Sequence, residues 1–217
     1  MQIFDYHPPS IPWLDIRYHD RDIIIINKPS GLLSNPGIAP HTFDCALTRL
    51  QHLYPEAILV HRLDCDTSGI MVFARNKKAE SHLKTQFQDR KTEKVYIAKV
   101  GGQIKQSQGS ITVNIGPDKA NPPYQQARED GKSAITHYQV LSQDQYSTLV
   151  KLTPETGRTH QLRVHMLVLG HAILGDKFYG SDAVIQASHR LCLHAAQLTI
   201  THPFSGKTLT FISKHPF

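Results

Sequence analysis

The stretch Ala57–Ala74 reads AILVHRLDCDTSGIMVFA, two apolar runs separated by a polar segment. The apolar runs, Ala57–Leu63 and Ile70–Ala74, are rich in aliphatic and β-branched residues, so they predict two strands of a buried sheet. The polar segment between them contains Thr, Ser and Gly, which favour a turn. It also places Asp64 at the end of the first strand, where a carboxylate can be held ionised and aimed at a substrate.

A further apolar run lies upstream of this stretch. Asp22–Asn27 contains four consecutive isoleucines and predicts a buried strand. The strand is followed by Lys28-Pro29-Ser30-Gly31, a cluster of turn-forming residues. Beyond it, apolar residues recur at helical spacing over Phe43–Leu53, and Thr42 or Asp44 is the expected N-cap of that helix.

The rest of the chain continues this pattern of short strands and few helices. Helices are expected at Lys77–Asp89 and His160–Leu169, and strands at Val95–Val100, Ser133–Leu141, Ser147–Leu152, Leu191–Leu193, Gln197–Thr201 and Thr208–Ile212. Gly101–Lys132 is rich in Gly, Pro, Gln and Asn, so we expect a long surface excursion with one short strand at Ile111–Ile115. Because neighbouring strands are joined by short turns, the sequence predicts a single α+β domain with a largely antiparallel or mixed sheet.

The composition favours a polyanionic partner. The chain has 24 Lys and Arg against 18 Asp and Glu, which gives a formal net charge of +6. Its first residues lack the basic start and apolar run of a signal peptide, and no stretch approaches the roughly 20 apolar residues that span a bilayer. The three cysteines form no Cys-x-x-Cys pair, and their odd number argues against a disulfide framework. We therefore expect a cytoplasmic protein that does not enter the membrane.

Local chemistry alone leaves the role of Asp64 open. The carboxylate can serve as a nucleophile, but it can equally cap the turn through Asx hydrogen bonds, as many loop aspartates do. Asp66, two residues further on, is a competing carboxylate that spacing does not separate from Asp64.

The segment Thr156–Arg163 is a second dense polar cluster, at the start of a predicted helix. Arg163 lies about 100° from Leu162 on the helix, at the flank of the apolar stripe. A cation in the first turn is not favoured by the helix dipole, so Arg163 needs an anionic partner. Asp64 is one candidate partner, and an unrelated surface salt bridge is the alternative.

Two other patterns do not support a site. His160 and His165 are five residues apart, do not share a helical face and have no Cys or carboxylate at ligand spacing, so we expect no metal there. Gly206-Lys207-Thr208 resembles the end of a phosphate-binding loop, but the earlier glycine of that motif would fall at Thr201.

Five segments together resemble the RluA family of pseudouridine synthases, in the order found in that family. His61–Gly69 is similar to the signature His-Arg-Leu-Asp-x-x-Thr-Ser-Gly, in which Asp66 falls at a variable position. The other four segments are similar to the family's remaining motifs: Asn27–Gly31, Lys94–Ala98, Gly157–His165 and Leu191–Ala195. The resemblance spans residues 22–202.

This resemblance implies both a fold and a set of roles. The fold would be α+β, with a curved, mixed but mostly antiparallel sheet, peripheral helices and a central cleft. Asp64 would be the nucleophile, Tyr96 would pack against the target base, and Arg163 would pair with Asp64. The substrate contacts implied are Arg62, which takes the place of the flipped uridine, Leu193 in the base pocket, Lys94 and Thr67.

The resemblance also implies what the enzyme acts on. We expect isomerisation of uridines in large-subunit (23S) ribosomal RNA and in the anticodon stem-loop of some transfer RNAs, without metal or cofactor. Only about 20 residues precede the first core strand, so we expect one catalytic domain over residues 1–217, without an N-terminal S4 RNA-binding module. We also expect the enzyme to act as a monomer. A non-catalytic RNA-binding module and a nucleoside or glycoside hydrolase that uses the same carboxylate are the alternatives.

Overall fold

A computed structural model describes residues 6–217, which form two compact units. The first unit consists of the described residues up to Glu93 together with Ala195–Lys214, and the second of Lys94–His194 with His215–Phe217. Both units are built from antiparallel strands with few helices, which confirms the α+β class and the mostly antiparallel sheet. No helix of the described residues is long and apolar enough to cross a membrane.

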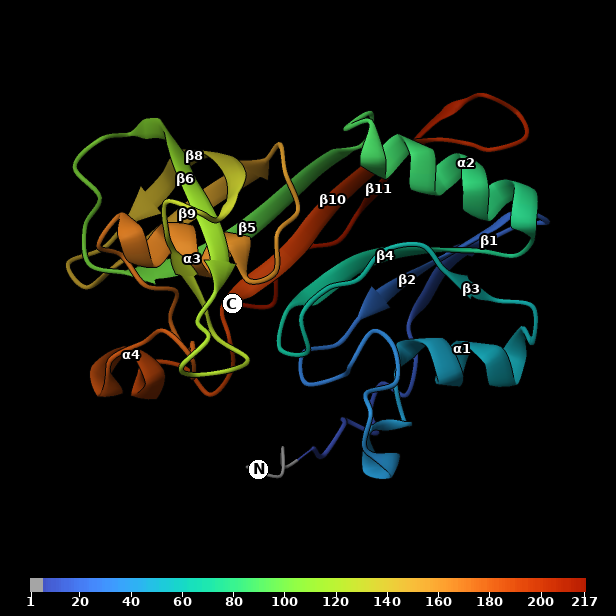
Figure 1. Cartoon of the computed structure of the whole chain (residues 1–217), viewed down its shortest axis with the longest axis horizontal. Helices are drawn as coiled ribbons and strands as arrows, with labels where there is room; N and C mark the ends of the chain where they lie inside the picture. Colours follow the sequence, from blue (N-terminus) through green and yellow to red (C-terminus); the bar gives the residue numbers. More distant parts are fainter. Residues whose placement is uncertain (1–5) are drawn as a thin grey trace. The chain divides into compact units, whose positions relative to one another are not determined.

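The first unit is a sheet covered by a helix on each face (Figure 1). Its strand order is β1 (Ile16–His19), β2 (Ile23–Lys28), β4 (Ser68–Ala74) and β10 (Leu193–Thr201), with β3 (Ile58–Leu59) on β4 and β11 (Thr208–Ile212) on β10. The four isoleucines of β2 are fully buried because α2 (Lys77–Gln88) covers one face and α1 (Ala46–Leu53) lies on the other. Alternation along the strand sends successive side chains to opposite faces.

Strand β3 is shorter than the strand expected over Ala57–Leu63. It pairs with β4 only at Ile58 and Leu59. Further along β4, a side chain replaces the backbone of β3 as hydrogen-bond partner: His61 Nε2 accepts the backbone N–H of Val72 at 3.1 Å. The ladder therefore ends before the polar segment, and the prediction of a strand up to Leu63 is wrong.

Helix α1 begins later than expected and has a different cap. The residue at the N-cap is Cys45, whose sulfur accepts from the N–H of Thr48 while the Thr48 hydroxyl accepts from the N–H of Cys45. Thr42 instead ends a short 3₁₀ turn over Pro40–Thr42, and Asp44 pairs with Arg49. Neither predicted cap is used, because the helix starts at Ala46 and Cys45 occupies the position directly before it.

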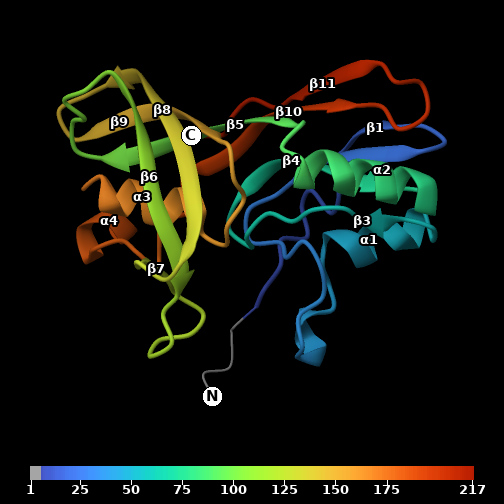
Figure 2. The ribbon, with the colours of Figure 1, turned by 45° about the horizontal axis from the view of Figure 1, so that its top comes forward.

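The second unit is a five-stranded antiparallel sheet with α3 (Gln161–Val168) packed against it (Figure 2). Its strand order is β5 (Glu93–Gly101), β9 (Ser147–Pro154), β8 (Lys132–Gln143), β6 (Gln108–Pro117) and β7 (Gln125–Ala127). The core joins apolar side chains of β5 and β9 to those of α3, among them Ala98, Val150, Leu162 and Met166. A short helix, α4 (Asp182–Gln186), follows α3 and was not predicted.

The interpretation of Gly101–Lys132 as a surface excursion is wrong in part. Strand β6 covers ten residues there and pairs with β8 from Gln108 opposite Gln139 to Ile115 opposite Lys132. Polar residues flank the apolar centre of β6 and lower its apparent strand propensity, so only that centre was recognised. The tail shows the opposite error, because the two strands expected around Leu191–Leu193 and Gln197–Thr201 are replaced by the single strand β10.

Candidate active site

Asp64 lies in the loop between β3 and β4, where the extended chain reaches a turn at Cys65 and Asp66. The N–H of Thr67 donates to the Asp64 carbonyl oxygen across this turn, at 3.1 Å. Leu63 is buried, whereas Asp64 and Asp66 are both half-buried. Burial therefore does not separate the two carboxylates, and the place of Asp64 in the sequence signature remains the reason to prefer it.

The segment that follows β2 holds this turn. The wholly buried Lys28 donates from Nζ to the carbonyl oxygen of Cys65 at 2.8 Å, and the N–H of Gly31 donates to the same oxygen at 3.0 Å. The Ser30 hydroxyl donates to the carbonyl oxygen of Asp66 at 2.6 Å. Two motifs that are far apart in the sequence are thus one hydrogen-bonded assembly, which fixes the backbone on the C-terminal side of the candidate nucleophile.

Ser34 fixes the backbone on the N-terminal side. Its buried hydroxyl donates to the carbonyl oxygen of Leu63 at 2.7 Å and accepts the Leu63 N–H at 3.0 Å. Leu63 lies outside any strand, so this one side chain satisfies both of its backbone groups. Nothing in the sequence pattern singled out Ser34, because its partner is 29 residues away.

We expect Ser34→Ala to lower the free energy of unfolding by about 1–3 kcal/mol, since it leaves the buried N–H and C=O groups of Leu63 without a hydrogen-bond partner. Because Asp64 follows Leu63 directly, kcat should fall by about ten- to a hundred-fold while RNA affinity stays unchanged. Denaturant unfolding and single-turnover kinetics measure the two effects. Ser34→Thr keeps the hydroxyl and should retain more activity than Ser34→Ala; equal losses would show that the hydrogen bonds to Leu63 do not position Asp64.

Glycine is required at the end of the polar segment. Gly69 has φ of +120°, and a Cβ atom there would lie 2.3 Å from the carbonyl oxygen of Ala195 in β10. Only a residue without a side chain permits that approach, which lets β4 and β10 lie side by side directly after the loop.

Two of the predicted substrate-contacting residues, Arg62 and Thr67, flank Asp64. Arg62 is exposed, and Thr67 is buried. The Thr67 hydroxyl has no hydrogen-bond partner among the described residues. A buried hydroxyl in that condition costs free energy unless a ligand or water satisfies it, so its environment is compatible with a substrate contact.

Three more of the predicted residues, Lys94, Tyr96 and Leu193, belong to the second unit. Tyr96 is half-buried and packs against the core cluster that includes the buried Leu193. Lys94 lies two residues before Tyr96 on β5 and is half-buried on the same strand face. The tyrosine ring therefore packs against the apolar cluster to which the buried leucine belongs.

Arg163 forms a buried ion pair with Asp176. Its Nε and Nη2 atoms donate to the two carboxylate oxygens at 2.8 and 2.6 Å, and the two side chains are 2% and 0% exposed. The carboxylate also accepts the N–H groups of Phe178 and Tyr179, at 2.9 and 3.1 Å. The guanidinium carbon lies 4.8 and 5.1 Å from the centres of those two rings. The arginine is thus held by a bidentate bond on its edge and by aromatic rings on its face.

The need of Arg163 for an anionic partner was predicted correctly, but the role of Asp176 was missed. The sequence signal that could have pointed to Asp176 is the glycine directly before it. Gly175 has φ of +74°, and a Cβ atom there would lie 1.9 Å from the Arg190 carbonyl oxygen, so the Gly175-Asp176 dipeptide forms a constrained turn. The pairing of Arg163 with Asp64 stays a prediction.

The helix that carries this arginine starts from a network of buried amides and hydroxyls. The Gln161 side chain accepts from the Thr156 hydroxyl at 2.7 Å and donates to the Thr136 hydroxyl at 3.0 Å. His160 takes the N-cap position with φ of +54°, a left-handed conformation that turns the chain sharply into α3. These contacts tie the first turn of α3 to β8, so the arginine is presented from a fixed backbone.

The two histidines considered as metal ligands bond to different partners. His160 Nδ1 bonds to the hydroxyl of Tyr179 at 2.7 Å, and His165 Nδ1 bonds to that of Thr136 at 2.9 Å. Burial lowers the pKa of His165.

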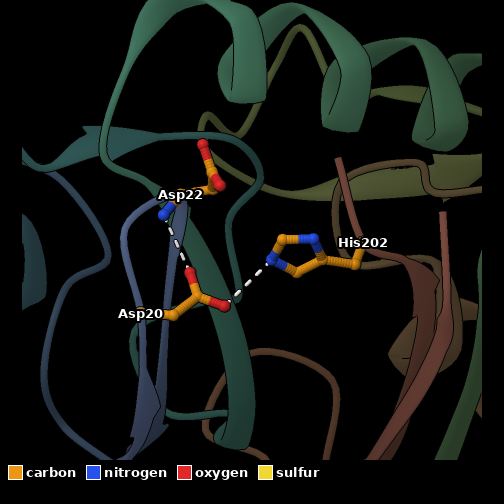
Figure 3. Close-up of side chains that lie close together, drawn as sticks. All are labelled: Asp20, Asp22 and His202. Atoms are coloured by element: carbon orange, nitrogen blue, oxygen red, sulfur yellow. Dashed lines mark hydrogen bonds and ion pairs between the residues drawn. The ribbon is translucent and has the colours of Figure 1, made fainter. Parts of the chain in front are cut away.

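One group of three potential metal ligands occurs within residues 6–217: Asp20, Asp22 and His202, with ligand atoms within 4.8 Å of one another (Figure 3). His202 Nδ1 accepts the N–H groups of Phe204 and Ser205, so its proton is on Nε2, which donates to Asp20 Oδ2 at 2.9 Å. Because both ring nitrogens are occupied, the histidine has no lone pair to offer a cation.

The Asp20 carboxylate is equally occupied. It accepts the N–H groups of Asp22 and Ile23 at 2.8 and 2.9 Å and the Tyr18 hydroxyl at 2.6 Å. Partial burial raises the pKa of Asp20, but these bonds and the one from His202 outweigh it, so its pKa lies below the usual value. Hydrogen bonding between Asp20 and His202 links the β1–β2 turn to the β10–β11 hairpin. Because their potential ligand atoms already take part in hydrogen bonds, the group does not fit a metal centre.

A comparison with protein families identifies the chain's relatives. The sequence model described as RNA pseudouridylate synthase matches residues 22–167, more than half of the chain and including the Asp64 loop and the first helix turn that carries Arg163. The chain belongs to this family. Membership confirms the resemblance to RluA-type pseudouridine synthases and the isomerase class of the enzyme.

Individual pseudouridine synthases match over nearly the whole chain. The dual-specificity RNA pseudouridine synthase RluA of Haemophilus influenzae is 48% identical over 221 residues, which cover 100% of both proteins. RluA of Escherichia coli K12 is 48% identical over 213 residues, 97% of each. Among solved structures, human RNA pseudouridylate synthase domain containing 1 superposes with a TM-score of 0.82 at 30% identity, covering 97% of this chain and 87% of that one.

Proposed function

We propose that the enzyme converts specific uridines to pseudouridine in two RNA classes, large-subunit (23S) ribosomal RNA and the anticodon stem-loop of some transfer RNAs. We infer the two RNA classes from full-length similarity to relatives that are named dual-specificity RNA pseudouridine synthases. The net charge of +6 supports binding to a polyanion.

Asp64 is the proposed nucleophile. Its carboxylate attacks either the ribose C1′, with uracil as leaving group, or C6 of the uracil ring. The C1′–N1 bond breaks, the uracil turns and a C1′–C5 bond forms, and the bond between the Asp64 carboxylate and C1′ or C6 breaks again, which regenerates the enzyme. N1 gains a proton, and loss of the C5 proton restores the ring. The product is an isomer of the substrate, so the reaction needs no co-substrate. The base must stay confined throughout, because its escape would turn the enzyme into a hydrolase.

Tyr96, Leu193 and Arg163 are proposed as further residues of the site. Tyr96 and Leu193 would hold the base, which the packing of Tyr96 against the apolar cluster that contains Leu193 supports. Arg163 would serve as the counter-charge of Asp64, and its fixed, buried guanidinium supports a positioning role. We propose that residues 1–217 act as one catalytic domain.

The remaining proposed contacts are with the RNA around the target. Flipping a uridine out of its stack costs a few kcal/mol, less in a loop, and Arg62 would offset that cost by taking its place. The exposure of Arg62 supports this role. The unsatisfied hydroxyl of Thr67 and the half-buried amine of Lys94 are proposed to contact the nucleotide.

We also propose that the enzyme acts in the cytoplasm as a monomer. Cys45, Cys65 and Cys192 are thiols and are not joined in disulfides, which supports a reducing compartment.

Dual specificity is testable with two short transcripts, a stem-loop from 23S ribosomal RNA and a transfer RNA anticodon stem-loop. Each should gain one pseudouridine when incubated with the protein, because single-stranded loops of both kinds present an unstacked uridine. Mass spectrometry of nuclease digests measures the product. Modification of only one transcript would contradict dual specificity, and modification of neither would contradict the proposed substrates.

A further inference from the structure

A basic groove runs along α2, and none of the candidate active-site residues lines it. We call it the α2 groove; its volume is about 760 Å³ and its lining residues are Lys77, Lys78, Ser81, His82, Thr85, Gln86, Lys91 and Thr201. All of these belong to the first unit. Three are lysines, and no carboxylate lines it among the described residues.

Hydrogen bonds of a buried glutamine hold the floor of the α2 groove in place. Gln86 is buried, accepts the Thr201 N–H at 2.7 Å through Oε1 and donates to the Thr201 carbonyl oxygen at 2.8 Å through Nε2. These two bonds fix the amide orientation, so Nε2 also donates to His82 Nδ1, at 2.9 Å. The neutral His82 ring therefore carries its proton on Nε2, which makes the exposed histidine a hydrogen-bond donor.

Two of the three lysines lie where the helix dipole disfavours a cation. Lys77 and Lys78 are the first two residues of α2, at the positive end of the helix dipole, where cations are disfavoured. Glu80 pairs with Lys77 and with Lys84, whereas none of the ion pairs described for α2 includes Lys78. An anion in the α2 groove would relieve this repulsion.

The third lysine, Lys91, lines the α2 groove because the chain turns sharply where the helix ends. Arg90 adopts φ of +58°, where glycine is usual, and the N–H groups of Arg90 and Lys91 donate to the carbonyl oxygens of Phe87 and Gln86. Lys91 pairs with Asp89 at 3.1 Å, but both side chains are exposed, so a phosphate can displace that partner.

The last turn of α2 contacts the segment that leads to Asp64. The ring of Phe87, in the last turn of α2, stacks on His61 with centroids 4.5 Å apart, and His61 opens the sequence signature. The 12-residue helix is about 18 Å long, enough to follow several phosphates of one strand.

We propose that the α2 groove binds the phosphate backbone of the RNA substrate at a distance from the modified uridine. The proposal rests on the RNA substrate proposed above and adds a second contact region to it. The lysines would contact phosphates, and His82 would donate a hydrogen bond to a phosphate oxygen. Such contacts set affinity and register without reading the sequence.

The test replaces the three groove lysines together, Lys77→Gln, Lys78→Gln and Lys91→Gln, and measures RNA affinity from low to high salt. Each lost phosphate contact lowers the slope of log K against log salt by about 0.7–0.9, so the slope should fall by about 2. The Kd at 0.1 M salt should rise by at least about ten-fold, while kcat at saturating RNA stays unchanged.

The matched control is the triple variant Lys84→Gln, Lys105→Gln and Lys214→Gln, which removes the same charge from exposed positions outside the α2 groove. It should change slope and Kd much less. Equal effects of the two triple variants, or a wild-type slope in the groove variant, would overturn the proposal. Unchanged kcat in the groove variant keeps this outcome distinct from failure of the proposed function, which would appear as absent product in the wild type.

Discussion

Replacing Asp64 with Asn is expected to abolish pseudouridine formation while leaving the fold and RNA affinity intact. The amide is isosteric with the carboxylate but is not a nucleophile, so the single-turnover rate should fall by at least about 10⁴-fold. The backbone of the loop should hold its place, because Lys28, Ser30 and Ser34 bond to the carbonyl oxygens of Cys65, Asp66 and Leu63, which the substitution leaves in place.

Asp66→Asn is the matched control for this variant, since Asp66 is the neighbouring half-buried carboxylate of the same turn. It should retain most of the wild-type rate. If Asp66→Asn were inactive and Asp64→Asn active, the assignment of the nucleophile would be reversed.

Removal of Arg163 should have the second-largest effect, because Arg163→Ala leaves the Asp176 carboxylate buried without its cation. Breaking a buried pair by deleting one partner lowers the free energy of unfolding by about 3–5 kcal/mol. We also expect kcat to fall, since Arg163 is proposed to position Asp64. Denaturant titration and single-turnover kinetics measure the two effects separately.

A double variant separates the structural role of Arg163 from the catalytic one. Arg163→Met with Asp176→Asn removes both charges, and the Asn oxygen can still accept the N–H groups of Phe178 and Tyr179. Most of the stability should return, whereas kcat should remain low. Recovery of both stability and kcat would show that Arg163 serves the fold alone.

The parts of the fold that the sequence predicts are those with dense local patterns. The isoleucine run of β2 and the apolar stripe of α2 were located to within about a residue. Strand β6 was found only at its centre, because its flanking polar residues are stabilised by pairing with β8, which a local pattern does not record.

The same distinction applies to the candidate site. The buried lysine and hydroxyl that hold the Asp64 loop act on carbonyl groups 37 and 29 residues away, so spacing does not reveal them. Arg163 shows an intermediate case. Its position on the helix predicts that it needs an anion, but the choice of Asp176 depends on a turn 13 residues further along the chain.

The most direct test of the central claim uses RNA tritiated at uridine C5 and follows both the label and the base. We expect the wild-type protein to release tritium while the base stays in the RNA as pseudouridine, and Asp64→Asn to release none. Free uracil in the supernatant would indicate a hydrolase. Binding of RNA with no release of tritium by the wild type would contradict uridine isomerisation by this chain.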